Sequence, residues 1–253
     1  MIVVTRTPCP PILNRNGPDW LTTLESARSR FDSETSDPTA LERDKNQVKK
    51  QLKAAQGKYN HATIKKSLET MFNGGVESKE TKCAYCETYI ESKKAQDIEH
   101  FYPKSVYWRK TFEWENLLIA CLTCNEEFKL DGFPLDVNGD PLLINPTTTD
   151  PADHLDFIFD FDTLDSHIEG KDEMGRITVD FFALNGIRLS DKKERGLAKN
   201  RNTSVSGWFA FALLIQQEPD PVKSQQLKAK LHQLCHFQTQ YAAFARAIYA
   251  AIG

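Results

Sequence analysis

The chain has 253 residues, enough for one or two domains with a sizeable hydrophobic core. Hydrophobic residues make up 40% of it and charged residues 26%, which excludes a low-complexity or disordered chain. No apolar run approaches the roughly 18 residues that a membrane helix needs. The proline-broken N-terminus is neither a signal peptide nor a transit sequence. We therefore expect a cytoplasmic protein without a membrane partner.

The formal net charge of −3 hides two segments of opposite charge. Residues 41–66 contain eight Lys and Arg residues and two acids, a surplus of six positive charges. Residues 131–173 contain twelve acids and one lysine, a surplus of eleven negative charges. Phosphate binding normally leaves a basic surplus, but the acidic segment masks any such surplus in the total. The net charge therefore neither supports nor excludes a nucleic-acid partner.

The first 76 residues are predicted to be loops and helices. Prolines interrupt residues 1–38 and leave room for one short helix at 20–31. Further helices are expected at 39–56 and 62–72. The last of these should end at Asn73-Gly74-Gly75, because glycine readily adopts the left-handed conformation that ends a helix.

Two Cys-x-x-Cys pairs follow, Cys83/Cys86 and Cys121/Cys124, separated by thirty-four residues. Together they supply four thiolates for a closed tetrahedral zinc site, whereas disulfides are expected mainly in secreted chains. A closed site has no open position for catalysis. We therefore predict a structural zinc whose binding energy is coupled to folding.

Candidates for catalysis lie between and beside these pairs. Residues 97–103, Asp-Ile-Glu-His-Phe-Tyr-Pro, are predicted to form a strand that proline ends. An isolated Glu-His pair on a strand is most often a buried structural pair. Here Glu99 and His100 are followed by Asn116, and by Asn125 directly after the second cysteine pair. The combination favours a functional site.

The C-terminal half is predicted to begin with a long hairpin. Residues 157–162 alternate like a half-buried strand, and the β-branched run 176–180 is its predicted partner. Gly170 and Gly175 lie in the acidic connection between them, which fits a turn. The remaining predicted elements are helices at 183–199, at 203–217 and from Val222 onward. The apolar stripe of the last helix favours core packing, with a partner-docking seam as the alternative.

The order of motifs in residues 83–129 resembles the HNH (ββα-metal) nucleases: CxxC, an acid-His-x-x-Pro strand, Asn-Leu, and CxxC-Asn-x-x-x-Lys. His100 matches the first letter of the motif, Asn116 the N, and Asn125 the last position, which is asparagine in many members. Glu99 stands where the family more often has Asp or His. Its longer side chain still reaches a hard cation through oxygen.

The resemblance implies hydrolysis of phosphodiester bonds. This reaction requires a deprotonated water and neutralisation of charge on the leaving oxygen. Histidine suits the role of general base, and the resemblance gives that role to His100. It also implies that Glu99 and Asn125 bind one catalytic Mg²⁺ or Mn²⁺ ion and that Asn116 positions the His100 loop. The candidates for phosphate contacts, with solvated surface residues as the alternative, are Lys104 and Lys129.

Over most of its length the chain resembles one branch of this superfamily, the HNH subunit of Septu anti-phage defence systems, also found as an effector beside some retrons. The likeness rests on residues 4–11 (Val-Thr-Arg-Thr-Pro-Cys-Pro-Pro), on the local sequences around Cys83 and His100, and on Ala-Leu-Asn-Gly at 183–186 followed by Arg195. It implies an ATPase partner with an ABC-like nucleotide-binding fold and cleavage of nucleic acid during infection.

The sequence thus predicts an α+β protein, mainly helical, with a zinc-stapled ββα nuclease unit embedded between helical regions. The predicted regions are a loop-rich and helical one at 1–76, the HNH unit at 77–135, and an acidic hairpin with partner-docking helices at 136–253. A DNA endonuclease is the favoured function. The alternatives are an effector that cleaves RNA (tRNA included) and a non-catalytic zinc module for nucleic-acid binding or assembly.

Overall fold

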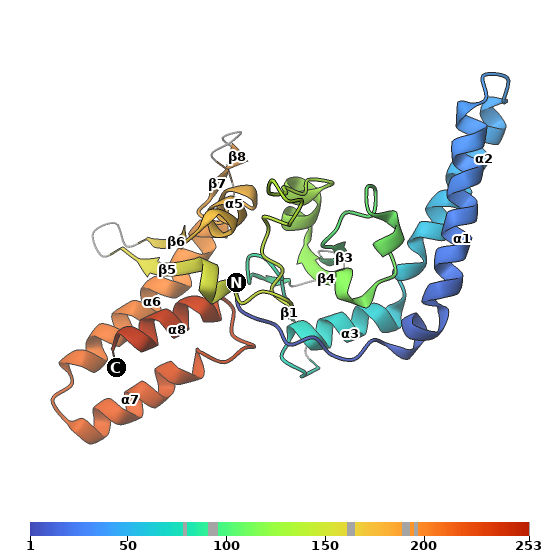
Figure 1. Cartoon of the computed structure of the whole chain (residues 1–253). Helices are drawn as coiled ribbons and strands as arrows, with labels where there is room; N and C mark the ends of the chain where they lie inside the picture. Colours follow the sequence, from blue (N-terminus) through green and yellow to red (C-terminus); the bar gives the residue numbers. More distant parts are fainter. Residues whose placement is uncertain (78–79, 91–95, 161–164, 189–192, 195–196, 253) are drawn as a thin grey trace. The chain divides into compact units, whose positions relative to one another are not determined.

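The computed structural model describes all residues except 78–79, 91–95, 161–164, 189–192, 195–196 and 253. It is an α+β protein in which helices predominate and the described strands pair in small two-stranded sheets (Figure 1). The chain divides into two compact units. Unit 1 comprises Met1–Thr5, Glu69–Asp97 and Ile119–Gly253, and unit 2 comprises Arg6–Leu68 and Ile98–Leu118. Region 77–135, expected as one nuclease unit, therefore contributes residues to both.

The helices are α1 (Pro11–Ser36), α2 (Glu42–Gln56), α3 (Ala62–Phe72), α4 (Pro151–His154), α5 (Glu173–Phe181), α6 (Leu197–Gln217), α7 (Pro221–Gln233) and α8 (Ala242–Ala251). Short 3-10 helices are η1 (Gly57–Tyr59), η2 (Trp108–Lys110) and η3 (Trp114–Asn116), and η4 (Thr123–Lys129) is a π-helix. The strands pair as β1 (Thr81–Lys82) with β2 (Tyr89–Ile90), β3 (Gln96–His100) with β4 (Leu117–Cys121), β5 (Leu155–Phe159) with β6 (Ser166–Gly170), and β7 (Ile187–Arg188) with β8 (Lys193–Glu194).

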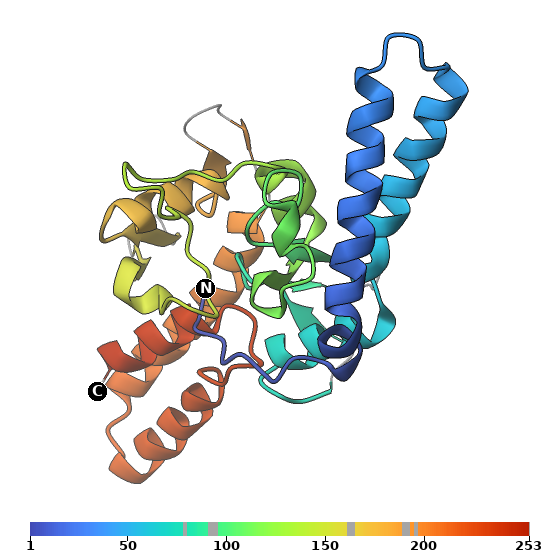
Figure 2. The same cartoon turned by 45° about the vertical axis from the view of Figure 1, so that its right-hand side comes forward.

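In unit 2, α1 and α2 pack side by side as a helical hairpin (Figures 1 and 2). The prediction of a short helix at 20–31 was wrong in extent. Pro11 is the first residue of α1, a position where a missing backbone N–H costs nothing, and Pro18 is accommodated inside the helix. The apolar contact between the two helices is narrow, with Leu24 and Val48 among its few buried side chains.

In unit 1, the strand partner predicted for residues 157–162 was wrong. β5 pairs antiparallel with β6, with Leu155 opposite Gly170 and Phe159 opposite Ser166. The β-branched run 176–180 instead belongs to α5, because Asp172 caps this helix by accepting a hydrogen bond from the N–H of Gly175 at 2.8 Å. Residues 161–162 of the predicted strand lie outside the described residues.

Gly170 and Gly175 are packing positions rather than the turn expected from the sequence. Gly170 ends β6 and Gly175 lies in the first turn of α5. A Cβ on Gly175 would clash with the carbonyl oxygen of His154 and stand 2.9 Å from the Cα of Gly170. The backbone of α5 can therefore approach the hairpin only because both positions lack a side chain.

We expect Gly175→Ala to lower the free energy of unfolding by about 2 kcal/mol or more, because backbone atoms must move to admit the methyl group. Gly207→Ala in α6 is the matched control. A Cβ there meets no atom within 4 Å, so this change should raise stability by about 0.5–1 kcal/mol through helix propensity. Urea unfolding of both variants measures the difference, and equal stabilities would contradict the packing account.

Three helices complete unit 1: α6, α7 and α8 pack against one another. The prediction of a helix at 183–199 was wrong for its described residues before 197, which form a turn, β7 and β8; only from Leu197, where α6 begins, is the segment helical. The long helix predicted from Val222 is interrupted at residues 234–241. Its apolar stripe is mostly buried, at Leu231, Phe244 and Ile248, as core packing requires. Among the described helices, none is both long and apolar enough to span a bilayer.

Candidate metal centre and catalytic residues

The four cysteines of the two CxxC pairs lie together in unit 1. The sulfur atoms of Cys83, Cys86, Cys121 and Cys124 are all within 4.8 Å of one another, and those of Cys86 and Cys121 are 3.9 Å apart. Zn–S bonds of about 2.3 Å in a tetrahedron place the sulfurs roughly 3.8 Å apart. The cluster therefore fits a single zinc ion, as the sequence predicted.

The first cysteine pair occupies the turn of a tight hairpin. β1 and β2 pair antiparallel, with Lys82 opposite Tyr89. The N–H of Cys83 donates to the carbonyl of Thr88 at 3.0 Å, and the N–H of Glu87 donates back to the carbonyl of Cys83 at 3.1 Å. Glu87 has a positive φ of 58°, a conformation that non-glycine residues rarely adopt. The turn must therefore be held by contacts from elsewhere.

Those contacts come to Glu87 from both ends of unit 1. Its buried carboxylate binds the amino group of Met1 at 3.0 Å and the ammonium of Lys82 at 3.2 Å, and it lies 3.4 Å from the backbone nitrogen of Ala243, which donates to it. Burial opposes ionisation of Glu87, but the two cations outweigh it and hold its pKa below the ordinary value. Lys82 also donates to the carbonyl of Thr239. The residues before and within α8 thus brace the hairpin that carries Cys83 and Cys86.

The second cysteine pair leads into the π-helix η4. Burial raises the pKa of Cys124 well above its ordinary value, and hydrogen bonding with Cys121 and the other thiols adds to the shift. Four clustered thiols thus resist ionisation by themselves, and a soft divalent metal would have to displace their protons to bind them as thiolates.

In unit 2, His100 ends β3 with a buried and tightly held ring. Its Nε2 lies 3.0 Å from the carbonyl oxygen of Thr111, and Tyr59 packs edge-on against the imidazole with the ring centres 4.4 Å apart. A carbonyl only accepts hydrogen bonds, so Nε2 of the neutral ring carries the proton. The tautomer is thereby fixed, with Nδ1 as the basic nitrogen.

Asn116 holds the loop that follows His100. Its amide oxygen accepts from the N–H of Tyr102 at 2.7 Å, and its amide nitrogen donates to the carbonyls of Tyr102 and Lys110 at 3.1 and 3.0 Å. Its own carbonyl accepts from the N–H of Phe101 at 2.9 Å. Asn116 is buried. These bonds join both ends of the segment 102–116.

Arg6 supports this loop and was not singled out from the sequence. Its guanidinium donates to the carbonyls of Trp114 at 2.9 Å, Glu115 at 3.0 Å and Leu117 at 2.7 Å. Burial lowers the pKa of Arg6 to about 10. The sequence feature that could have pointed to Arg6 is its position in the motif at residues 4–11. Its hydrogen bonds to the loop give this motif a structural role.

Carboxylates and an amide oxygen are available near the cysteines and on β3. Glu99 is buried in unit 2. In unit 1, the amide nitrogen of Asn125 donates to Asp97 at 3.2 Å, which leaves the amide oxygen of Asn125 as its acceptor atom. Asp97 was not among the predicted site residues. The sequence could have pointed to Asp97, because side chains alternate between the two faces of a strand. Asp97 and Glu99 are two positions apart and therefore share one side of β3.

The two candidate lysines lie in different surroundings. Lys104 packs its ammonium over the ring of Tyr59 at 5.5 Å, in the same unit as His100. Lys129 is 1% exposed and packs over Phe133 at 5.9 Å. A buried lysine reaches phosphate only after a rearrangement, so the contact of Lys129 with phosphate stays a prediction, as does that of Lys104.

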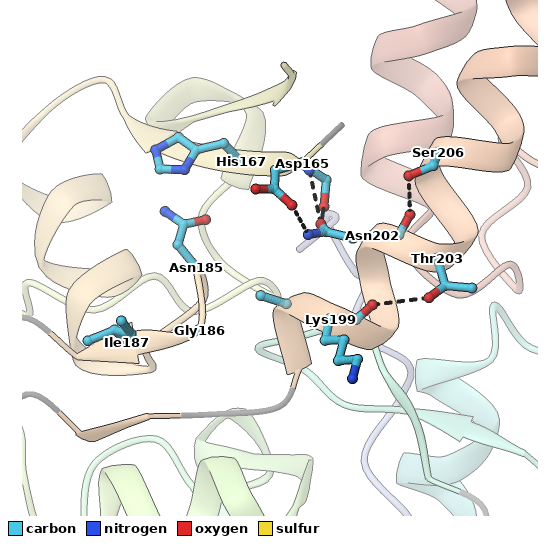
Figure 3. A pocket seen from close by; sticks show the side chains of 11 residues that line it. Asp165, His167, Asn185, Gly186, Ile187, Lys199, Asn202, Thr203 and Ser206 are labelled. Carbon is cyan, nitrogen blue, oxygen red and sulfur yellow. Dashed lines mark hydrogen bonds between the residues drawn. The ribbon is translucent and has the colours of Figure 1, made fainter. Parts of the chain in front are cut away.

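A cavity of about 860 Å³ opens elsewhere in unit 1 (Figure 3). Asn202 donates to Asp165 at 2.6 Å, and Asn185 bonds the N–H and carbonyl of Ile168 at 2.9 and 2.8 Å. The motif at 183–186 thus joins the turn after α5 to β6. Arg195, which accompanies the motif in sequence, lies outside the described residues.

Comparison with known proteins relates the chain to Septu proteins. No family model and no solved structure matches it. It is 28% identical over 162 residues to the Septu protein PtuB of Bacillus mycoides (strain KBAB4), which covers 54% of this chain and 52% of that protein. It is 35% identical over 113 residues to the Septu protein PtuB of Bacillus thuringiensis, which covers 44% of this chain and 40% of that protein. The chain spans about half the length of the curated relatives it matches. The chain is therefore similar to Septu PtuB proteins, as its motifs indicated.

Proposed function

We propose that this chain is a metal-dependent HNH endonuclease and the nuclease subunit of a Septu-type anti-phage defence complex with an ATPase partner. The observation that carries the proposal is the fixed tautomer of His100, whose Nε2 donates to the carbonyl of Thr111. This bond leaves Nδ1 as the basic nitrogen, which is what a general base requires. The similarity to Septu PtuB proteins and the cysteine cluster support the same function.

His100 acts in this proposal as the general base. Nδ1 takes a proton from the attacking water, and the bond to Thr111 stabilises the imidazolium that forms. Tyr59 restricts rotation of the ring. Asn116 and Arg6 hold the loop on which this geometry depends. His100 is only 3% exposed and its Nδ1 is buried, so the attacking water reaches this nitrogen only after a rearrangement of its surroundings.

Glu99 and Asn125 are proposed to hold the catalytic divalent ion, with Asp97 as a further ligand or as the group that orients Asn125. Carboxylate and amide oxygens select hard, hydrated cations such as Mg²⁺ or Mn²⁺. Such an ion supplies neutralisation of charge on the scissile phosphate and the leaving oxygen. Asn125 follows Cys124 directly, so zinc at the cysteines would hold the amide in place without taking part in the reaction.

The direct test is incubation of the full chain, with and without the neighbouring ATPase, on labelled DNA and RNA in Mg²⁺ or Mn²⁺. We expect metal-dependent cleavage that disappears with mild EDTA and returns with Mg²⁺ or Mn²⁺ without added zinc. Cleavage of RNA alone would change the substrate but keep the enzyme. Cleavage of neither polymer in any combination would leave the zinc-module alternative.

One substitution distinguishes the zinc site at the cysteines from the proposed site of the catalytic ion. Asn125→Ala should abolish or strongly weaken Mg²⁺-dependent cleavage while zinc stays bound, because thiolates hold zinc and the amide oxygen holds the other ion. Asn125→Asp, which keeps an oxygen ligand, is the matched control and should retain part of the activity. If Asn125→Ala strips the zinc, measured by elemental analysis, the two sites are not distinct.

A further inference from the structure

The hairpin of α1 and α2 carries a cationic surface that the proposed active site does not use. We call it the hairpin basic face, defined by the exposed Lys49, Lys50 and Lys53, which lie within about 100° of one another around α2. Among the described residues, none of these three lysines takes part in an ion pair, and neither does Arg30 or Lys58. The two acids of α2 stand in its first turn, where they offset the helix dipole rather than the lysines.

A groove of about 600 Å³ runs between the two helices, on the flank of α2 that carries Gln51 and Ala54 and that is opposite to Lys49 and Lys53. It is lined by Thr22, Thr23, Ser26, Ala27, Arg30, Gln51, Ala54, Ala55 and Lys58. The only charged side chains in this lining are the cations Arg30 and Lys58. The lining is otherwise small or polar, so the groove offers an anion an approach between two positive charges.

The basic face does not serve the stability of the hairpin. Lys45, Lys49 and Lys53 follow one another at four-residue intervals, and like charges at this spacing destabilise a helix by about 0.2–0.5 kcal/mol per pair. The hairpin has few buried apolar residues to offset this repulsion. Repulsion of this kind is relieved when an anionic partner binds.

The same surface lacks the features of a protein-docking site. Among the described residues of α1, α2 and their connection, Leu41 at the tip is the only large hydrophobic side chain that is exposed. Protein interfaces depend on buried aromatic and apolar anchors and contain few lysines. Nucleic-acid backbones require the opposite surface, one of unpaired cations at regular spacing, and the lysines recur about every 6 Å along α2.

We infer that the hairpin basic face binds the phosphate backbone of the nucleic acid on which the enzyme acts, and that Arg30 and Lys58 flank a second phosphate position in the groove on the other flank of α2. This inference rests on the proposed function, since it assigns a binding surface to that substrate. Contacts with phosphate carry no base sequence, so the face binds DNA or RNA by charge and geometry. The face is thus a second substrate-binding surface, formed by residues that are separate in sequence from the proposed catalytic residues.

The test is binding of the full chain to labelled duplex DNA and to labelled RNA, followed by fluorescence anisotropy over a range of salt concentrations. His100→Ala is present throughout so that the probes stay intact. The triple change Lys49→Gln, Lys50→Gln and Lys53→Gln should weaken binding by about 10-fold or more near 0.1 M salt. It should also reduce the slope of log affinity against log salt by roughly 2–3, since each lost phosphate contact removes about 0.9.

The matched control removes three lysines from α7 in unit 1: Lys223→Gln, Lys228→Gln and Lys230→Gln. Net charge changes equally, so affinity should stay within about 2-fold of the parent. Glutamine and lysine have similar helix propensities, and circular dichroism verifies that both triple variants are folded. The RNA and DNA probes together show which polymer the face prefers.

A second pair of variants tests the groove itself. Ala54 is exposed and lines the groove, so Ala54→Glu places a carboxylate between the two cations, and Ala54→Gln adds the same bulk without charge. Relative to the glutamine variant, the glutamate variant should bind nucleic acid about 3–10-fold more weakly. Equal binding by the two would exclude the groove as a phosphate site.

Three other outcomes of the binding experiments overturn the inference. If the α2 and α7 triple variants lose equal affinity, only net charge matters; if the parent binds neither polymer, the face is not a nucleic-acid surface. If the α2 variant keeps its affinity but changes self-association in sedimentation, the face docks an acidic surface of a second copy. Cleavage is measured separately, on chains that retain His100. There, normal cleavage by the α2 variant with unchanged affinity overturns this inference alone. Normal binding through the hairpin without cleavage by the parent overturns the nuclease proposal and leaves the binding inference standing.

Discussion

Replacement of Cys121 by serine is expected to remove the zinc and to unfold unit 1. The Cys121 sulfur lies 3.9 Å from that of Cys86 and accepts from the N–H of Cys124 at 3.4 Å. It therefore joins the two halves of the metal centre. Structural zinc contributes about 10 kcal/mol or more of binding energy that is coupled to folding. This exceeds the net stability of many domains, so loss of one thiolate should be decisive.

The measurement is elemental analysis together with thermal unfolding. The parent should contain about one zinc per chain. Cys235→Ser is the matched control, because Cys235 is half-buried in the same unit but outside the cluster. It should retain zinc and differ from the parent by about 1 kcal/mol at most. A parent that is soluble and folded but free of zinc would refute the structural metal.

Replacement of His100 by alanine is expected to lower the rate of cleavage by about 100-fold or more, the usual scale for loss of a general base. Zinc content should not change, because His100 lies outside the cysteine cluster. The free energy of unfolding should fall by about 2–4 kcal/mol, because the change removes a buried ring packed against Tyr59 and leaves the buried carbonyl of Thr111 without its donor. The unchanged zinc content therefore separates the loss of catalysis from unfolding of the metal centre.

His100→Asn sharpens this experiment, since its amide can donate to the carbonyl of Thr111 but cannot accept a proton at neutral pH. We expect it to be nearly as inactive as the alanine variant and more stable. His167→Ala, at an exposed position on β6, should cleave at the parental rate. If His100→Ala cleaves as fast as the parent, the HNH assignment fails and the zinc-binding module becomes the better interpretation.

The parts of the fold that could be predicted are those that a short stretch of neighbouring residues determines. The helix at 62–72 was predicted with the bounds observed, because Gly74 and Gly75 adopt positive φ values of 67° and 85° directly after it. The cysteine cluster was predictable because chelation imposes the CxxC spacing on the sequence. A strand was predicted at 97–103, and the observed β3 ends at His100, three residues before Pro103.

The errors arose where distant packing outweighs local preference. Ile177, Thr178 and Val179 favour a strand, yet they form a helix because the cap at Asp172 and the close approach of Gly170 to Gly175 depend on the assembled hairpin. The break between α7 and α8 contains neither glycine nor proline, and its αL residue is Tyr241. Nothing in the local sequence marks that position.

The candidate site was predictable in its residues but not in its supports. His100, Asn116 and the cysteines follow from motifs. Arg6 and Tyr59 reach the same loops from segments that no short motif connects to them. Long-range partners of this kind are visible only after the chain has folded.

The bracing of Glu87 by Lys82 and by the N–H of Ala243 has a thermodynamic consequence. These bonds join the hairpin that carries Cys83 and Cys86 to the segment that begins α8. Metal binding by the cysteines and ordering of α8 are therefore linked equilibria. By reciprocity, ordering of α8 favours metal binding by the same factor by which metal binding favours ordering of α8. A fragment cut after residue 135 would lack one half of that cycle, and its metal affinity would differ from that of the whole chain.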